Sequence, residues 1–407
     1  MGEEPDEPAV APFKRRRFLA SAAVAAGAPT AVAGPAQAAA SQADMAAADV
    51  AAMDMAAMDM AAAEVAAAQA PAQAAAGLGS VARLMAVPED SRGVAWLRSA
   101  LQVAVGLELA TIPPYLCGWW SVKDQRSEVA RMIRRIVGDE MYHLGIVCNL
   151  LVAVGGRPQI KAAAPVYPGP LPGGVRAGVT VYLSGLTRPF VRDVMMAIEA
   201  PEVSLARSVQ PSPTVGEFYE GMLGAFRAVR PDLATRGQVT QHIDTDELRP
   251  VRTLDDVEHA IEIIREQGEG TESSPTDSFS DDRPAHYYAF GEIYHGRELR
   301  ETDDGWRFVG PPVPFPDVRP MAPVPVGGWR NTSAHVGGLL FRFDAMYSTV
   351  LDSLDAAWAG GGHRTLGAGI RTMRGLEKPA VELMETGIPG GRGTYGPQFR
   401  ALRRPRR

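Results

Sequence analysis

The stretch DEMYH at residues 139–143 contains a Glu-x-x-His step. The step lies within residues 127–154, where apolar residues recur at helical spacing. Residues three apart share one face of a helix, so the Glu140 carboxylate and the His143 imidazole can bind the same metal ion. A second copy, EIYH at residues 292–295, offers Glu292 and His295.

Single glutamates are available on two further predicted helices. Glu108 lies in an apolar helix predicted over residues 91–110, and Glu217 lies in a helix predicted over residues 214–230. One glutamate on each of two helices, with Glu-x-x-His on each of the other two, is the ligand set of dinuclear iron or manganese sites in ferritin-like four-helix bundles. Bridging carboxylates neutralise two divalent ions, and the imidazoles leave positions open for dioxygen or a substrate. The sequence therefore predicts two iron ions per chain, with manganese as the alternative.

The two single glutamates differ in their surroundings. Glu108 lies among apolar residues, and a carboxylate on an apolar helix is costly unless it binds a cation; an internal salt bridge is the other interpretation. Glu217 follows Thr214 by three residues, which is the spacing of a capping box, so its carboxylate can serve the helix terminus instead. In that case Glu220 or Glu199 supplies the carboxylate of the third helix.

Two histidines compete as the imidazole of the fourth helix, predicted over residues 284–295. A long connection between the second and third helices makes the first helix run parallel to the fourth. Glu108 lies toward the C-terminal end of its helix, which favours ligands from the same end of the fourth helix, namely Glu292 and His295. His286, near the N-terminal end of that helix, is the alternative.

The whole pattern predicts a mainly α protein. We expect a ferritin-like four-helix bundle with a long crossover between the second and third helices, and a loop-rich, partly helical C-terminal extension. The crossover is the Pro- and Gly-rich stretch 157–189, with one expected strand at residues 178–183. Pro113 and Pro114 are expected to end or kink the first helix. Other helices are predicted over residues 191–200, 254–267, 338–358 and 366–386.

The N-terminal residues have the composition of a targeting segment. Residues 15–19 (RRRFL) fit a twin-arginine signal, and residues 36–38 (AQA) offer a cleavage site. We therefore expect export by the twin-arginine route to an extracellular, periplasmic or cell-envelope location. The predicted segments are the signal peptide 1–38, an Ala-rich low-complexity linker 39–85, a ferritin-like helical core 90–300, a C-terminal extension 301–390 packed on the core, and a basic tail 391–407.

Composition argues against several classes of protein. A net charge of −6 over 407 residues argues against a nucleic-acid partner. Two cysteines exclude a disulfide scaffold. The sequence after the N-terminus has no long, strongly apolar run, so we expect no transmembrane span in the mature chain. The many predicted loops favour a monomer or a small homo-oligomer over a large assembly.

Several motifs follow one family closely, and over about residues 90–385 the chain resembles the ferritin-like domain of iminophenyl-pyruvate dimer synthases. Related domains occur in enzymes that couple two indole-pyruvate imines in violacein and indolocarbazole biosynthesis. The resemblance implies a ferritin-like core and an iron site, and it favours His286, because the family's His-Tyr-Tyr stretch matches there. The acid that the family pattern has three residues before that histidine is Arg283 here. The motifs are LELATIPPYL (107–116), DEMYH (139–143), NLLVAVGGRP (149–158), YPGPLP (167–172), IEAPE (198–202), GEFY (216–219), QGEG (267–270) and HYYAF (286–290).

These observations lead to one main expectation of function. We expect an exported dinuclear iron oxidoreductase of secondary metabolism, similar to iminophenyl-pyruvate dimer synthases. It would act with dioxygen or peroxide on a small imine or keto-acid substrate derived from an amino acid. Tyr115, Tyr142 and Tyr294 are candidates for gating the site or donating protons. The alternatives are iron handling by ferroxidation without an organic substrate, and a metal-free binding module.

Overall fold

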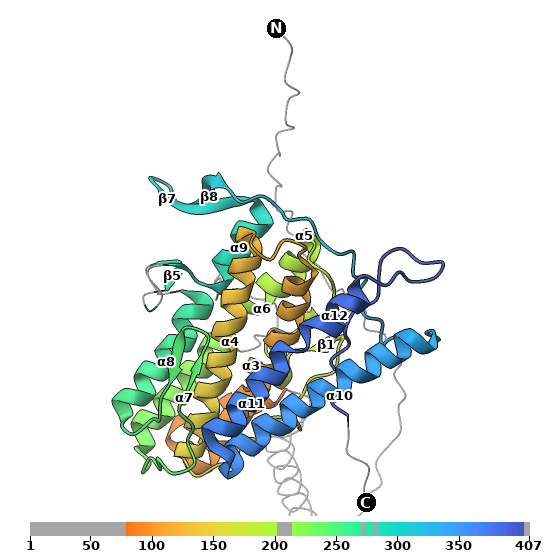
Figure 1. Cartoon of the computed structure of the whole chain (residues 1–407). Helices are drawn as coiled ribbons and strands as arrows, with labels where there is room; N and C mark the ends of the chain where they lie inside the picture. The colour runs from red at the N-terminus through yellow and green to blue at the C-terminus, as the bar shows by residue number, and fades with distance from the viewer. Residues whose placement is uncertain (1–78, 202–213, 271–273, 278, 280–282, 403–407) are drawn as a thin grey trace, which may run out of the picture. The chain divides into compact units, whose positions relative to one another are not determined.

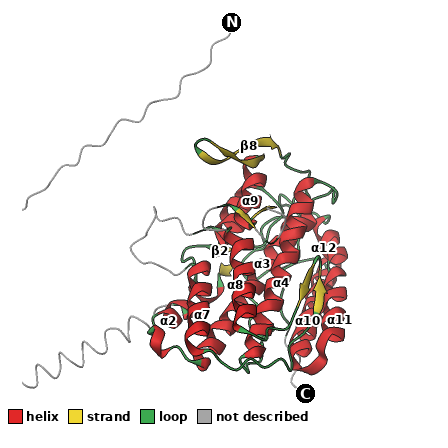
Figure 2. Ribbon diagram, turned by 90° about the vertical axis from the view of Figure 1, so that its left-hand side faces the viewer, coloured by secondary structure: helices red, strands yellow, loops and turns green. Residues whose placement is uncertain are grey.

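The computed structural model describes residues 79–201, 214–270, 274–277, 279 and 283–402. The predicted export signal and most of the predicted linker lie outside the described residues. The described part is mainly helical, with long helices in its core and a helical region near the C-terminus (Figures 1 and 2). Its helices of eight or more residues are α3 (Val94–Ser121), α4 (Glu128–Ala153), α7 (Val215–Val229), α8 (Leu254–Glu269), α9 (His286–His295), α10 (Ala334–Ala356), α11 (Gly362–Arg374) and α12 (Glu377–Met384).

The two longest helices, α3 and α4, pack against each other at the centre of this part of the chain. The Ser127 side chain caps α4 by accepting a hydrogen bond from Ala130 N at 3.3 Å. By length and composition each helix could cross a membrane, but 89% of the apolar window of each is buried within the fold. Burial of this kind is usual for core helices.

Helix α3 continues through Pro113 and Pro114 to Ser121, so the expectation that these prolines end it is wrong. Proline lacks an N–H group and so deprives the carbonyl four residues earlier of its helical hydrogen bond. The Tyr167 hydroxyl donates to Ala110 O, four residues before Pro114, at 2.8 Å. This contact replaces the hydrogen bond that Pro114 removes, and the surrounding side chains bury the helix here.

The chain leaves α4 through residues 154–187, which contain no helix longer than a single turn. This segment includes strands β1 (Gly169–Pro170) and β2 (Thr180–Val181) and the short turn η2 (Pro172–Gly174). Helix α7 then packs on α8, while α7 also contacts α3 and α8 contacts α4. Both helices begin with capping boxes, which satisfy the free N–H groups of their first turns. The predicted helix over residues 214–230 is confirmed.

Two shorter helical segments complete the surroundings of α3 and α4. Residues 188–199 form α5 (Arg188–Phe190), the π-helical turn η3 (Val191–Met196) and α6 (Ala197–Glu199) in direct succession. Helix α9 packs against η3 and also contacts α4 and α8. Single π-helical turns inside helices often occur at functional sites. This packing brings the end of α6 and the start of α9 toward α3 and α4.

The C-terminal helices α10, α11 and α12 pack together, and α12 contacts α3. The predicted helix over residues 366–386 is divided into α11 and α12 by a turn at Gly375 and Leu376. The last described residues run along α10, where Arg400 N and the Gln398 amide donate to the Asp344 carboxylate at 3.0 and 2.9 Å. Between them, Phe399 is buried and stacks on Trp120.

Strands in the described residues pair only into two-stranded antiparallel ribbons, and these ribbons do not join into a larger sheet. The longest ribbon follows α9 directly and extends from the end of that helix (Figure 1). The short helix α2 (Ser80–Met85) precedes α3 and buries Val81. The ribbons beyond β1–β2 pair β3 (Gln241–Ile243) with β4 (Asp246–Leu248), β5 (Thr276–Asp277) with β6 (Arg283–Pro284), and β7 (Arg297–Thr302) with β8 (Gly305–Pro312).

Candidate metal centre

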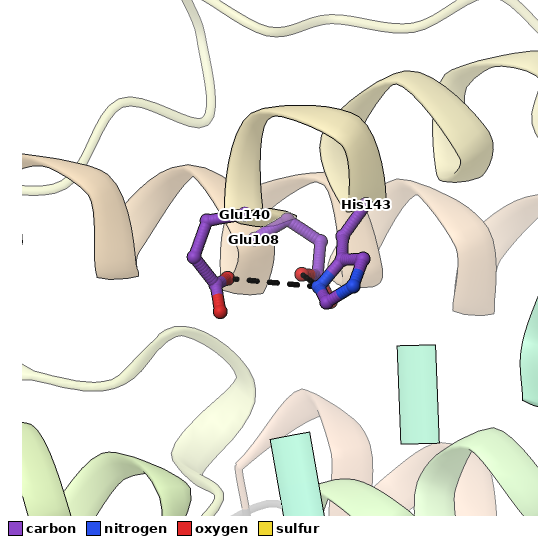
Figure 3. Close-up of side chains that lie close together, drawn as sticks. All are labelled: Glu108, Glu140 and His143. Atoms are coloured by element: carbon purple, nitrogen blue, oxygen red, sulfur yellow. Dashed lines mark ion pairs between the residues drawn. The ribbon is translucent and has the colours of Figure 1, made fainter. Parts of the chain in front are cut away.

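One half of the candidate site is made by the two central helices. Glu108 lies in the middle of α3, and Glu140 and His143 lie one turn apart on the facing side of α4 (Figure 3). The His143 Nδ1 atom is 3.7 Å from Glu108 Oε2 and 3.9 Å from Glu140 Oε2. All three side chains are buried, and their ligand atoms lie close enough together to hold one metal ion.

The other half uses the shorter helical segments. Glu199 is the last residue of α6, and His286 is the first residue of α9. The His286 Nδ1 atom is 2.9 Å from Glu140 Oε1 and 3.9 Å from Glu199 Oε2. Glu140, Glu199 and His286 form a second group of buried ligands that could hold one metal ion. Glu140 belongs to both groups and directs a different carboxylate oxygen toward each imidazole.

The outer nitrogen of each imidazole is held by a polar side chain. His143 Nε2 lies 2.7 Å from Gln267 Oε1, and His286 Nε2 lies 3.2 Å from Asp139 Oδ2. Each Nε2 therefore donates, and each Nδ1 faces the glutamates. A metal-binding histidine usually has such an acceptor on its far nitrogen, which fixes the tautomer and the ring orientation. His286 Nδ1 is also buried without a hydrogen bond of good geometry, as expected of a nitrogen directed at a cation.

Hydroxyl groups also bind each of the three carboxylates. The Tyr219 hydroxyl donates to Glu108 Oε1, and the Tyr115 hydroxyl donates to Glu199 Oε1. These hydrogen bonds leave Glu108 Oε2 facing His143 and Glu199 Oε2 facing His286. The Thr111 hydroxyl lies 2.8 Å from Glu140 Oε2. The side chains are thus held in place before any ion binds.

The protein places an excess of negative charge in this buried cluster. Burial and the Glu140 charge raise the pKa of Glu199 to about 8, and the same two causes raise the pKa of Glu108. Burial alone would lower the pKa of His286, but the hydrogen bond to Asp139 and the Glu140 carboxylate raise it to about 10. Buried carboxylates that crowd together require protons or cations to neutralise them. In the protein without metal, the His286 imidazolium supplies part of that charge.

A pocket adjoins the cluster and contains a cavity of about 50 Å³. Glu108, Glu140, His143 and Glu199 form its polar wall. The opposite walls include apolar side chains from several elements: Leu107, Leu171, Ile198, Val215 and Ile264. A small molecule in this pocket would therefore contact the glutamates and one imidazole directly.

Several residues predicted for the site lie elsewhere. Glu217 is exposed and accepts a hydrogen bond from Thr214 N at 2.8 Å, so it serves the capping box of α7. Glu220 is exposed and pairs with Arg265 at 2.7 Å. The structure corrects the expectation for the third carboxylate, because Glu199 reaches the cluster and Glu217 does not.

The second Glu-x-x-His step also lies outside the cluster. Glu292 is buried, but its carboxylate accepts a hydrogen bond from Leu299 N at 2.8 Å. His295 is exposed and stacks on Phe308 at 4.4 Å. The imidazole that α9 brings to the cluster belongs to His286, and position 283, three residues earlier, is an arginine. The four-carboxylate set expected from spacing is therefore corrected to Glu108, Glu140 and Glu199 with two histidines.

Sequence reasoning did not identify the residues that support the imidazoles. Asp139 directly precedes Glu140, and its role depends on the contact with α9. Gln267 stands in the QGEG motif at residues 267–270, and the motif alone does not indicate which side chain it contacts. Of the tyrosines predicted near the site, Tyr115 contacts a cluster carboxylate, that of Glu199. Tyr219, which was not among the predicted tyrosines, contacts the carboxylate of Glu108.

Comparison with known proteins agrees with this architecture. Residues 101–295 match the family model described as ferritin-like. A crystal structure described as a ferritin-like protein from Caulobacter vibrioides matches with a TM-score of 0.54 and 22% sequence identity, over 75% of this chain and 97% of that chain. No curated protein matches. The chain therefore contains a ferritin-like domain, and its buried glutamate and histidine clusters are consistent with a dinuclear metal site.

Proposed function

We propose that this protein is a dinuclear metal oxidoreductase, with iron as the metal, that acts with dioxygen or peroxide on a small organic substrate. Glu108 and His143 would hold one ion, Glu199 and His286 the other, and Glu140 would bridge both. The observation that carries the proposal is that the two oxygens of Glu140 face different imidazoles, one 2.9 Å away and the other 3.9 Å away. A bridging carboxylate of this kind is characteristic of dinuclear carboxylate sites.

The residues present fit such a metal pair. Carboxylate and imidazole together suit divalent iron or manganese, and the absence of thiolates among the ligands argues against soft metals. The buried carboxylates need positive charge, and His286 Nδ1 lacks a properly oriented partner. Among the residues that the structure describes, three carboxylates and two imidazoles converge, so coordination positions remain for dioxygen and a substrate.

When bound, the metal pair would supply electrons for the reduction of dioxygen or peroxide and act as a Lewis acid toward the substrate. The protein's own groups position this chemistry. Gln267 and Asp139 fix the imidazoles, and the Tyr219 and Tyr115 hydroxyls fix the outer oxygens of Glu108 and Glu199. Burial raises the pKa of both tyrosines, so their hydroxyls stay protonated and remain hydrogen-bond donors.

The pocket supports a small substrate of mixed polarity. Apolar side chains line it beside the clustered glutamates, and Arg265 and Glu269 add charged groups to the lining. The resemblance to iminophenyl-pyruvate dimer synthases favours an imine or keto acid derived from an amino acid. In the proposed reaction two electrons and two protons leave the substrate and reduce dioxygen to hydrogen peroxide, or peroxide to two water molecules.

Oxygen consumption tests this proposal. Protein reconstituted with ferrous iron would be supplied with aromatic 2-imino acids and 2-keto acids, and both oxygen uptake and oxidised organic products would be measured. We expect turnover that is lost in Glu140→Ala and retained in Glu217→Ala, which alters an exposed glutamate outside the cluster. Oxidation of iron with no organic product from any substrate would instead support the iron-handling alternative.

We also propose that the twin-arginine motif at residues 15–19 directs export, so that the metal is loaded before translocation. Cell fractionation of an Arg15→Lys, Arg16→Lys double variant should show the protein retained in the cytoplasm. The Arg403→Lys, Arg404→Lys variant is the matched control. Light scattering of the exported protein should give the mass of a monomer or a small homo-oligomer, and a cage-sized particle would contradict this.

A further inference from the structure

The two halves of the metal cluster are built from different parts of helices. Glu108 lies inside the long helix α3, and Glu140 and His143 lie inside α4, so we call their site the mid-helix position. Glu199 is the last residue of α6 and His286 is the first residue of α9, and with Glu140 they make the helix-end position. Residues at a helix end lack part of the backbone hydrogen bonding that holds residues inside a helix. The helix-end position therefore depends on what holds the two helix ends.

The side chain of Arg176 holds the end of α6. Its Nε atom donates to Ile198 O at 3.0 Å, and Ile198 directly precedes Glu199. The last carbonyls of a helix have no partner within it, so this contact supplies a donor where one is needed. The Arg176 Nη2 atom also lies 3.8 Å from Glu269 Oε1, at the end of α8. One guanidinium thus ties the end of α6 to the end of α8.

The backbone of Arg176 is strained. Its φ angle of +48° lies in the left-handed region, which residues other than glycine seldom adopt. Strain of this kind persists only where the surrounding structure fixes it, and it is concentrated at functional sites. At position 176 the contacts with Ile198 and Glu269 fix the conformation, and a glycine, which would relieve the strain, could not make them.

The side chain of Arg135, on α4, holds the start of α9 in a similar way. Its Nη2 atom donates to Pro284 O at 3.1 Å, two residues before His286. Its Nη1 atom lies 3.4 Å from Asp139 Oδ2, the oxygen that accepts from His286 Nε2. One guanidinium therefore fixes both the backbone that enters α9 and the carboxylate that orients the first imidazole of that helix.

We propose that Arg176 and Arg135 are positioning residues of the helix-end position. Each fixes the backbone beside one ligand, so that Glu199 and His286 stay directed at Glu140. The inference rests on the dinuclear centre proposed above, and it adds that the two metal positions fail separately. Loss of either arginine releases the ion at the helix-end position, whereas the ion at the mid-helix position stays bound by ligands inside α3 and α4.

Manganese(II) is the probe for a test that does not require turnover, since carboxylate and imidazole ligands suit this ion. The whole protein would be dialysed to equilibrium with Mn(II), and bound metal would be measured by elemental analysis and electron paramagnetic resonance. We expect two ions per chain with a spin-coupled spectrum in the wild type. Arg176→Met and Arg135→Met should keep one ion with unchanged affinity, show the hyperfine spectrum of an isolated Mn(II) ion, and bind the other ion at least tenfold more weakly.

Arg319→Met is the matched control for the loss of a half-buried arginine. Arg319 Nη1 donates to Trp120 O and Val122 O at the end of α3, at 3.2 and 3.1 Å. Its side chain is 17% exposed, as is that of Arg135. Trp120 lies about 18 Å along α3 from Glu108. We therefore expect Arg319→Met to bind two ions with the coupled spectrum of the wild type.

Arg176→Lys tests whether the hydrogen bond to the end of α6 is the cause. A lysine keeps a donor at nearly the position of Arg176 Nε, so the second ion should bind with an affinity between those of Arg176→Met and the wild type. The ion retained at the mid-helix position reports that each variant is folded, and the lysine variant serves where the methionine variant does not fold.

Three results would overturn the proposal: two ions of unchanged affinity in both arginine-to-methionine variants, equal weakening of both ions, or loss of the second ion in Arg319→Met as well. One ion or none in the wild type would instead contradict the dinuclear centre itself. The wild-type measurement therefore tests the proposed function, and the difference between variants tests the role of the two arginines.

Discussion

At the scale of single residues, Glu140 organises the candidate centre. Its Oε1 faces His286 and its Oε2 faces His143, so one carboxylate joins the ligands of α3 and α4 to those of α6 and α9. The outer carboxylates are each turned toward the imidazoles by a tyrosine hydroxyl. The ligand positions therefore depend on a surrounding layer of hydrogen bonds as much as on the ligands themselves.

Gln267 provides a direct test of this layer. Gln267→Leu removes the acceptor of His143 Nε2 and frees the ring to rotate or change tautomer, so we expect iron affinity to fall by about 10–100-fold. Gln267→Glu keeps an acceptor oxygen and should retain most of the affinity. Competitive titration against a chelator of known affinity measures the change. Equal loss in both variants would show that Gln267 acts only through packing.

Spacing along the sequence predicted part of this site. Glu140 and His143 share a helix, so their three-residue spacing was sufficient to pair them, and the apolar surroundings of Glu108 indicated its burial. The choice between Glu199 and Glu217, and between His286 and His295, depended on how separate helices pack. The second Glu-x-x-His step was misleading because α9 presents its first residue, rather than its last turn, to α4.

At the scale of secondary-structure elements, the unbroken α3 depends on a tertiary hydrogen bond. Tyr167→Phe would leave the buried Ala110 carbonyl without the donor that compensates for Pro114. We expect the free energy of unfolding to fall by about 1–3 kcal/mol, the usual cost of an unpaired buried polar group. Urea denaturation measures this. Tyr182→Phe is the control, since the Tyr182 hydroxyl has no hydrogen-bond partner among the residues that the structure describes; an equal loss there would contradict the explanation.

Asp344, a buried residue of α10, should make the free energy of unfolding depend on pH. Burial raises the pKa of Asp344 to about 6, above its ordinary value of 3.8. The folded protein therefore binds more protons than the unfolded chain between these values, and its stability falls as pH rises from about 4 to 6. Asp344→Asn removes this contribution, so its free energy of unfolding relative to wild type should increase on the order of 2–3 kcal/mol across this range. A constant difference between the two proteins would contradict the pKa shift.

Most helices could be predicted from periodicity and caps, including α4, α7 and α8. The continuation of α3 could not, because the hydroxyl that supports it comes from residue 167, which is distant in the sequence. The packing of residues 395–402 was also missed. These residues have a tail-like composition, but Phe399 and the contacts with Asp344 attach them to α10.

At the scale of the whole molecule, α3 and α4 separate two pockets of different chemistry. One adjoins the buried glutamates and histidines, and the other is an apolar pocket lined by α3, α4, α10 and α11. The ferritin-like domain thus supplies the candidate metal centre, while the C-terminal helical region adds a second enclosed surface. The two pockets share no lining residue.

The dinuclear centre is tested most directly by the number of metal ions bound per chain after anaerobic reconstitution with ferrous iron, measured by elemental analysis. We expect about two iron ions per chain in the wild type, in Glu217→Ala and in Glu292→Gln. Glu140→Ala should bind less than one, because it removes the ligand shared by both positions. One ion or none in the reconstituted wild type, or two ions in Glu140→Ala, would contradict a dinuclear centre bridged by Glu140.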